Sequence, residues 1–144
     1  MKLLVDTNVY LELLLKREKY DSVLDFFKMC ISRKNQTCIT TMSLRDIGYI
    51  AHRFVHDNEI SRQMQFHAYE ISSEVVSISP DSVIDSLYSD NSDYEDSLQS
   101  IAAEEALCDA IITFNKKDYK KGLIPVFTPE EICNIWKKNP RIII

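Results

Sequence analysis

Short apolar stretches that alternate with longer helical segments constrain this chain more than any other feature of its sequence. The apolar stretches have the length and composition of buried strands, and they cover residues 2–5, 37–40, 75–78, 110–114 and 124–127. The segments between them place apolar side chains at helical spacing, over residues 9–16, 21–33, 43–56, 59–73, 82–89 and 93–107 and from Pro129 onward. Strands separated by helices pair in parallel, so this order predicts an α/β fold with a mostly parallel sheet of about five short strands.

The length of 144 residues fits one domain, which we expect to cover residues 1–144. Only two glycines, Gly48 and Gly122, are present, which excludes glycine-rich phosphate loops of the Walker and dinucleotide-binding types. No apolar run approaches the roughly 20 residues that a membrane-spanning helix needs. The four cysteines share no C-x-x-C spacing, which favours buried free thiols over a disulfide pair. We therefore expect a soluble, cytoplasmic protein.

The net charge of −5 is unevenly distributed along the chain. Residues 54–115 contain 13 acidic residues and a single base, Arg62, whereas the rest of the chain contains 16 bases and 9 acids. An acidic total argues against a protein that wraps nucleic acid through its overall charge. The basic remainder still allows a local surface that binds phosphate groups.

Acidic residues follow the predicted strands at the ends where parallel sheets place their ligands. Asp6 ends the first strand, and Asp46 lies in the first turns after the second. Asp118 comes shortly after the fourth strand. Asp93 and Asp96 are three residues apart, so they share a face of the helix that leads back to that strand. Four separate segments are therefore expected to bring carboxylates to one edge of the sheet.

Carboxylates gathered at one edge repel each other unless a cation lies between them. Oxygen ligands without His or Cys favour Mg²⁺ or Mn²⁺ over zinc. An ion held in this way activates water and neutralises charge on a phosphoryl group, which is the chemistry of phosphodiester hydrolysis. Helix capping is the alternative for each acid taken singly: Ser92 and Glu95 match a capping box beside Asp93, and Asp6 is in place to cap a helix that begins near Asn8.

The candidate acids lie in four longer motifs, which read LLVDTNVYLELL, TMSLRDIGYIAHR, SDYEDSLQSIAA and IITFNKKDY. In this order and at roughly this spacing, they resemble the PIN-domain ribonucleases, and among these the VapC-type toxins of bacterial and archaeal toxin–antitoxin pairs. The resemblance covers almost the whole chain. It implies a three-layer α/β/α fold and a divalent-metal-dependent endoribonuclease that acts as the toxin of such a pair.

The resemblance also implies roles for individual residues. The catalytic, metal-binding acids would be Asp6, Asp46, Asp96 and Asp118, with Asp93 as an auxiliary metal ligand. The supporting polar residues would be Thr7, Asn8, Thr113 and Asn115. The second acid of the family is most often Glu, so the shorter Asp46 requires a closer approach of its helix to the Mg²⁺ or Mn²⁺ ion, or a bridging water.

The implied partners are an RNA substrate, a second copy of the chain in a homodimer, and an antitoxin segment that covers the acidic groove. The apolar residues Ile142 to Ile144 are a candidate part of an interface, and the lysines around Asp118 are candidates for gripping phosphate. Two alternatives stay open. One is a PIN-like module that binds RNA or protein without cutting, which the Asp at position 46 allows. The other is an aspartyl-phosphate phosphatase, although Asn8 stands where that family has a second Asp.

Overall fold

Five parallel strands form the central sheet of the computed structural model, which describes residues 1–88, 94–119 and 122–139, with the backbone alone at 94–96. The strands are β1 (Lys2–Val5), β2 (Gln36–Thr40), β3 (Glu74–Val76), β4 (Ala110–Ile112) and β5 (Val126–Phe127). Their order in the sheet is β3-β2-β1-β4-β5. The first strand of the chain is thus the central one, and Leu3 is paired with Thr37 on one side and Ala110 on the other.

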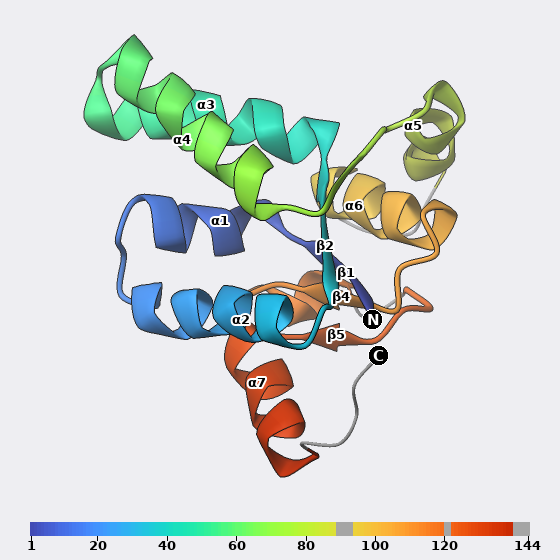
Figure 1. Ribbon diagram of the computed structural model, residues 1–144. Helices are drawn as coiled ribbons and strands as arrows, with labels where there is room; N and C mark the ends of the chain where they lie inside the picture. Colours follow the sequence, from blue (N-terminus) through green and yellow to red (C-terminus); the bar gives the residue numbers. More distant parts are fainter. Residues whose placement is uncertain (89–93, 120–121, 140–144) are drawn as a thin grey trace.

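Helices cover both faces of this sheet, which confirms the three-layer α/β/α fold (Figure 1). The elements are α1 (Thr7–Leu14), α2 (Tyr20–Ser32), α3 (Thr41–Val55), α4 (Asn58–Ile71), α5 (Pro80–Leu87), α6 (Tyr94–Glu105), the short 3-10 helix η1 (Lys116–Tyr119) and α7 (Pro129–Lys138). The helices α1, α2 and α7 lie on one face, and α5 and α6 on the other, while α3 and α4 pair as a hairpin beside the carboxyl ends of the strands (Figure 1).

The alternation of side chains along β1 explains why the sheet has two cores. Leu3 and Val5 point into the larger core, which includes Phe26 of α2 and Trp136 of α7. Leu4 points to the opposite face and packs with α6 and with its strand neighbours. Leu3, Leu4 and Val5 are fully buried, as expected for a parallel strand covered on both faces.

Side-chain caps shift the helix boundaries from those predicted. The first helix begins at Thr7, two residues early, because the Asp6 carboxylate accepts a hydrogen bond from the Thr7 amide. The third begins at Thr41, because Thr40 caps it by accepting from the Ser43 amide. Thr128 caps α7 with a complete capping box, so this helix begins at Pro129 as predicted. The fourth strand ends at Ile112, two residues before its predicted end, and the sheet is parallel throughout the described strands.

The expectations from composition concern the cysteines and membrane-spanning helices. All four cysteines are buried and free, as predicted. No helix of the described residues combines the length and the apolar character that crossing a membrane requires. The predicted roles of Asp93 and of Ile142 to Ile144 fall outside the described residues.

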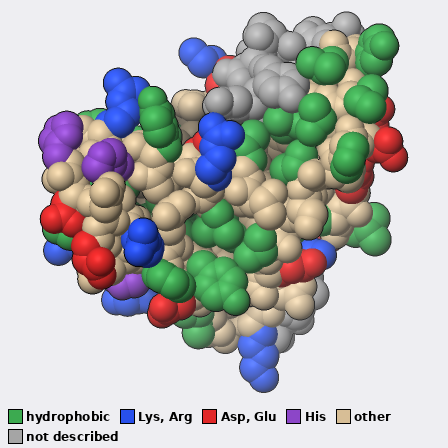
Figure 2. Space-filling view, turned by 90° about the horizontal axis from the view of Figure 1, so that it is seen from above, with side chains coloured by type: hydrophobic (Ala, Val, Ile, Leu, Met, Phe, Trp, Pro, Cys, Tyr) green, Lys and Arg blue, Asp and Glu red, His purple; other side chains and the backbone are tan. Residues whose placement is uncertain are grey.

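Exposed apolar side chains gather over the hairpin of α3 and α4 and over α5. Figure 2 shows this face of the molecule from above. Tyr49, Phe66 and Tyr69 on the hairpin are each more than half exposed, and so are Leu87 and Tyr88 at the end of α5. Basic side chains are interspersed among them on this face (Figure 2). A surface of this composition is typical of a region that contacts another molecule.

Candidate functional site

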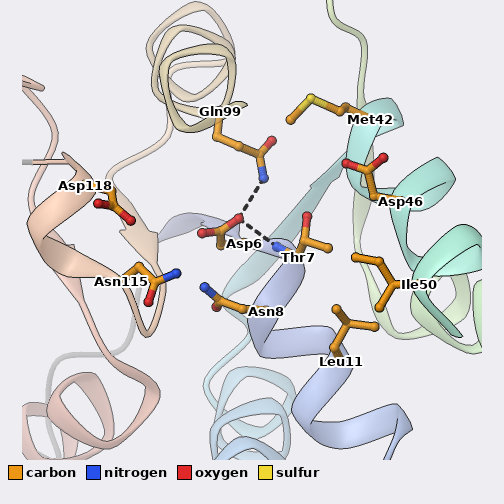
Figure 3. A pocket seen from close by; sticks show the side chains of 10 residues that line it. All are labelled: Asp6, Thr7, Asn8, Leu11, Met42, Asp46, Ile50, Gln99, Asn115 and Asp118. Carbon is orange, nitrogen blue, oxygen red and sulfur yellow. Dashed lines mark hydrogen bonds between the residues drawn. The ribbon is translucent and has the colours of Figure 1, made fainter. Parts of the chain in front are cut away.

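A cavity of about 220 Å³ opens at the carboxyl edge of the sheet, beside the ends of β1, β2 and β4. The lining residues, all labelled in Figure 3, are Asp6, Thr7, Asn8, Leu11, Met42, Asp46, Ile50, Gln99, Asn115 and Asp118. Three of the predicted acids therefore share one cavity. This is the edge at which open α/β sheets bind their ligands.

Asp6 is the most enclosed of these acids, with only 6% of its surface exposed. Its Oδ1 accepts hydrogen bonds from the Thr7 amide at 2.8 Å and from Nε2 of Gln99 at 3.1 Å. Its Oδ2 accepts from the hydroxyls of Thr113 at 2.8 Å and Tyr119 at 2.9 Å. Four donors use all the lone-pair positions of an ionised carboxylate. Asp6 therefore caps α1 and is also held in one orientation inside the cavity.

Thr113 connects Asp6 with two further polar residues of the predicted site. While its hydroxyl donates to Asp6, the same oxygen accepts from the Asn115 amide at 3.1 Å and from Nδ2 of Asn8 at 3.3 Å. Asn8 in turn accepts from the backbone amide of Phe114 at 3.3 Å. These bonds tie the start of α1 to the segment that follows β4. Direct or shared bonds around Asp6 thus bring together Thr7, Asn8, Thr113 and Asn115.

Two residues of this network, Gln99 and Tyr119, were missed by the sequence analysis. Gln99 belongs to α6 and is 1% exposed, and Tyr119 ends η1 and is 2% exposed. A signal for Gln99 was present, because it lies three residues after Asp96 and four before Ala103, on the apolar face of the helix. Tyr119 carried no signal of its own, since a tyrosine beside Asp118 is also typical of simple packing.

Asp46 reaches the cavity from α3, opposite the side that carries Asp6 and Asp118 (Figure 3). Its side chain is 17% exposed, and Nε of Arg45 lies 3.5 Å from its Oδ1. Burial raises the pKa of Asp46 above its ordinary value, and Arg45 offsets that rise only in part. Its negative charge is therefore poorly compensated by the protein, which favours the approach of a cation.

Asp118 lies in η1, where its backbone amide donates to the Asn115 carbonyl at 3.0 Å. Of the neighbouring lysines that were predicted to grip phosphate, Lys116 is paired with Glu131 of α7 at 2.8 Å. The ammonium group of Lys116 is thus held by the first turn of α7, and its contact with phosphate stays a prediction. Lys117 is exposed, and the other two lysines lie outside the described residues.

A sequence model of the PIN domain matches residues 2–117. The chain belongs to the PIN domain family. Solved structures agree with this assignment at the level of the fold. The VapBC2 complex of Rickettsia felis, bound to a DNA fragment from its promoter, is 14% identical with a TM-score of 0.65, covering 89% of this chain and 98% of the other. A toxin–antitoxin complex from Klebsiella pneumoniae is 21% identical with a TM-score of 0.61, covering 90% and 98%. No curated protein matches the sequence significantly.

The PIN domain match extends over the segments of Asp6, Asp46 and Asp96 and ends one residue before Asp118. The backbone at Asp96 belongs to α6, one turn ahead of Gln99, while its side chain is not described. Asp93 lies outside the described residues. Among the side chains that are described, no group of three or more His, Cys, Asp and Glu is close enough to hold one ion.

The donor set of this PIN domain nevertheless fits a hard divalent cation. The described acids of the cavity offer carboxylate oxygen, its neutral polar residues offer amide and hydroxyl oxygen, and neither histidine nor cysteine lines it. Mg²⁺ and Mn²⁺ prefer such ligands, and Mg²⁺ in particular keeps several of its waters and uses only one or two protein carboxylates. The three acids line the cavity but are not close enough together to surround one ion. This arrangement suits a cation that keeps part of its water shell.

Proposed function

We propose that this PIN domain is a divalent-metal-dependent endoribonuclease, and that it acts as the toxin of a toxin–antitoxin pair in the cytoplasm. The observation that carries the proposal is the convergence of Asp6, Asp46 and Asp118, from three different elements, on one cavity at the carboxyl edge of the sheet. Asp96 is assigned to the same site through its position on α6. The ion would be Mg²⁺ or Mn²⁺, with Asp93 as an auxiliary ligand.

When bound, the cation would supply an activated water and would neutralise charge on the phosphoryl oxygens. The residues of the chain have the complementary tasks. Asp6 is held in one orientation by its four donors, while Asp46 enters the cavity from the side away from Asp118 (Figure 3). Lys117 and Arg45 are exposed and are each next in sequence to an acid of the cavity, so their charges favour the approach of an RNA backbone.

Asn8, which stands two residues after Asp6 where the phosphatase family has a second Asp, favours this nuclease over an aspartyl-phosphate phosphatase. The exposed apolar side chains of α3, α4 and α5 support a role in which the protein is covered by a partner. We propose an antitoxin and a second copy of the chain as these partners.

The test is cleavage of single-stranded RNA by the full chain with Mn²⁺ or Mg²⁺, with and without chelator. Asp118→Asn should lower the rate at least about 100-fold, since even residues that only orient metal ligands contribute 10–100-fold. Glu130→Gln on the exposed first turn of α7 is the control that removes a charge elsewhere. Cleavage that resists chelator, or that survives in Asp118→Asn, would contradict the assignment. Growth arrest on expression, relieved by a small co-expressed partner, tests the toxin role.

A further inference from the structure

Gln99 makes three hydrogen bonds from a buried position on α6, to partners on two other parts of the fold. Its Nε2 donates to Oδ1 of Asp6 at 3.1 Å and to the hydroxyl of Ser43 at 2.9 Å. Its Oε1 accepts from the hydroxyl of Thr40 at 2.7 Å. Thr40 and Ser43 are themselves fully buried. Both amide hydrogens and the amide oxygen of Gln99 therefore have hydrogen-bond partners.

These bonds join the three elements that present Asp6, Asp46 and Asp96. Asp6 follows β1, Asp46 lies on α3 one turn beyond Ser43, and Asp96 lies on α6 one turn before Gln99. A further bond of 2.7 Å between the hydroxyls of Thr7 and Ser43 closes the connection between α1 and α3. A single side chain thus sets the spacing between the segments of three predicted metal ligands.

The two oxygens of Asp6 are held in different ways. The donors to Oδ1 are the amide of Thr7 and the amide of Gln99, and neither can withdraw its hydrogen without moving the chain or the side chain. The donors to Oδ2 are the hydroxyls of Thr113 and Tyr119, whose hydrogens can rotate away. In Figure 3, the oxygen bound by Gln99 and Thr7 faces those residues, and the other faces the side of Asp118.

We propose that Gln99 is a positioning residue: it fixes Oδ1 of Asp6 and the approach of α3, so that Oδ2 of Asp6 is the oxygen available to a divalent cation. This inference rests on the proposed metal-dependent function. Outer groups that orient metal ligands commonly change metal affinity by about 10–100-fold, although they never touch the ion.

Thr40 determines which end of the Gln99 amide faces Asp6. Its hydroxyl, which also caps α3, donates to Oε1 and so directs Nε2 towards the carboxylate. Without that donor, the amide is free to turn its oxygen towards Asp6, where two acceptors would repel each other. Among the described residues, the hydroxyl of Thr40 bonds Ser43 and Gln99 and none of the acids of the cavity, so its replacement tests the orientation of the amide separately from its presence.

The experiment measures Mn²⁺ binding to the full chain by calorimetry, together with the melting temperature without metal. Gln99→Met keeps the length of the side chain and should weaken Mn²⁺ binding by about tenfold or more. Thr40→Val should weaken it as well, and Thr40→Ser, which keeps the hydroxyl, should restore it. Thr37→Val is the matched control, because Thr37 lies on the same strand, is buried, and bonds only to Ile71 and Ser73 away from the cavity.

The outcomes separate this inference from the proposed function. If the unaltered chain binds no Mn²⁺, the proposed function fails and the inference fails with it. If the unaltered chain binds Mn²⁺, but Gln99→Met and Thr40→Val change the affinity by no more than about twofold, as expected for independent sites, the role of Gln99 is only structural. Should Gln99→Met not fold, the contrast between Thr40→Val and Thr40→Ser decides: equal affinities overturn the inference.

Discussion

The hydroxyl of Tyr119 donates a hydrogen bond of 2.9 Å to Oδ2 of Asp6, 113 residues away in the sequence. The bond is buried and its acceptor is a carboxylate, so it belongs to the stronger class of protein hydrogen bonds. Tyr119→Phe keeps the ring and removes this donor. We expect it to lower the free energy of unfolding by about 1.5–3 kcal/mol, measured by urea denaturation without metal.

Tyr10→Phe provides the comparison for that measurement. Tyr10 is also fully buried, and its hydroxyl bonds at 2.6 Å to the neutral hydroxyl of Ser72, remote from the cavity. Loss of the Tyr10 hydroxyl should lower the free energy of unfolding by only about 0.5–1.5 kcal/mol. Equal losses in the two variants would show that the charge of Asp6 adds nothing to the Tyr119 bond.

Thr113 acts on the same oxygen of Asp6 as Tyr119 and also accepts from two N–H groups. Thr113→Val removes a donor to Asp6 and leaves those N–H groups without their acceptor, so we expect a loss of about 2–4 kcal/mol in the free energy of unfolding. Thr113→Ser should retain most of the stability.

Because Thr113 and Tyr119 both bond Oδ2 of Asp6, the effects of Thr113→Val and Tyr119→Phe should not add, and a double-mutant cycle measures the difference. Additive losses would contradict a shared role.

Burial of Asp46 leads to opposite effects on stability and on metal binding. Since the pKa of Asp46 is raised in the folded state, its ionised form costs stability at any pH above that pKa, and the cost disappears as the pH falls below the ordinary value of 3.8. Asp46→Asn should therefore raise the melting temperature of the metal-free protein at pH 7 and weaken Mn²⁺ binding. The gain in melting temperature should vanish at low pH, where Asp46 itself is protonated. A variant that is less stable than the parent at pH 7 would contradict this interpretation.

The acids of the cavity could be predicted from the sequence because the cause of their convergence is topological. Strands in a parallel sheet end at the same edge, so Asp6 after β1, Asp46 after β2 and Asp118 after β4 had to lie near each other once the alternation of strands and helices was read correctly. The capping alternative for Asp6 is also confirmed, because its carboxylate caps α1 and lines the cavity at the same time.

The partners of these acids could not be predicted in the same way. Periodicity places Gln99 on the buried face of α6. It does not predict that Oδ1 of Asp6 and the hydroxyl of Ser43 lie there and accept hydrogen bonds from its amide group. The pairing of Lys116 with Glu131 depends on how η1 packs beside the first turn of α7, which no local pattern encodes. Contacts between side chains of distant elements are the part of the site that required the structure.

The pair of Lys116 and Glu131 gives a prediction that depends on pH and salt. Lys116, followed by the amide of Thr128, lowers the pKa of Glu131 below its ordinary value of 4.5. A lowered folded-state pKa means that the pair stabilises the fold fully above pH 4.5, and that this contribution is lost as the pH falls through the lowered value. Both side chains are nearly half exposed, so we expect Glu131→Gln to cost no more than about 1 kcal/mol at pH 7 and low salt.

Glu131→Gln isolates the charge of the pair, because the glutamine oxygen can still accept from the Thr128 amide and so keep the cap of α7. The difference from the parent should shrink in 1 M salt, where the screening length falls to about 3 Å. It should also vanish once the pH falls below the lowered pKa of Glu131, and urea denaturation under each condition measures it. Release of Lys116 also places a free ammonium group two residues from Asp118. If Lys116 can then contact phosphate, Glu131→Gln should bind single-stranded RNA more tightly at low salt, whereas unchanged RNA affinity would show that Lys116 serves only to anchor η1 to α7.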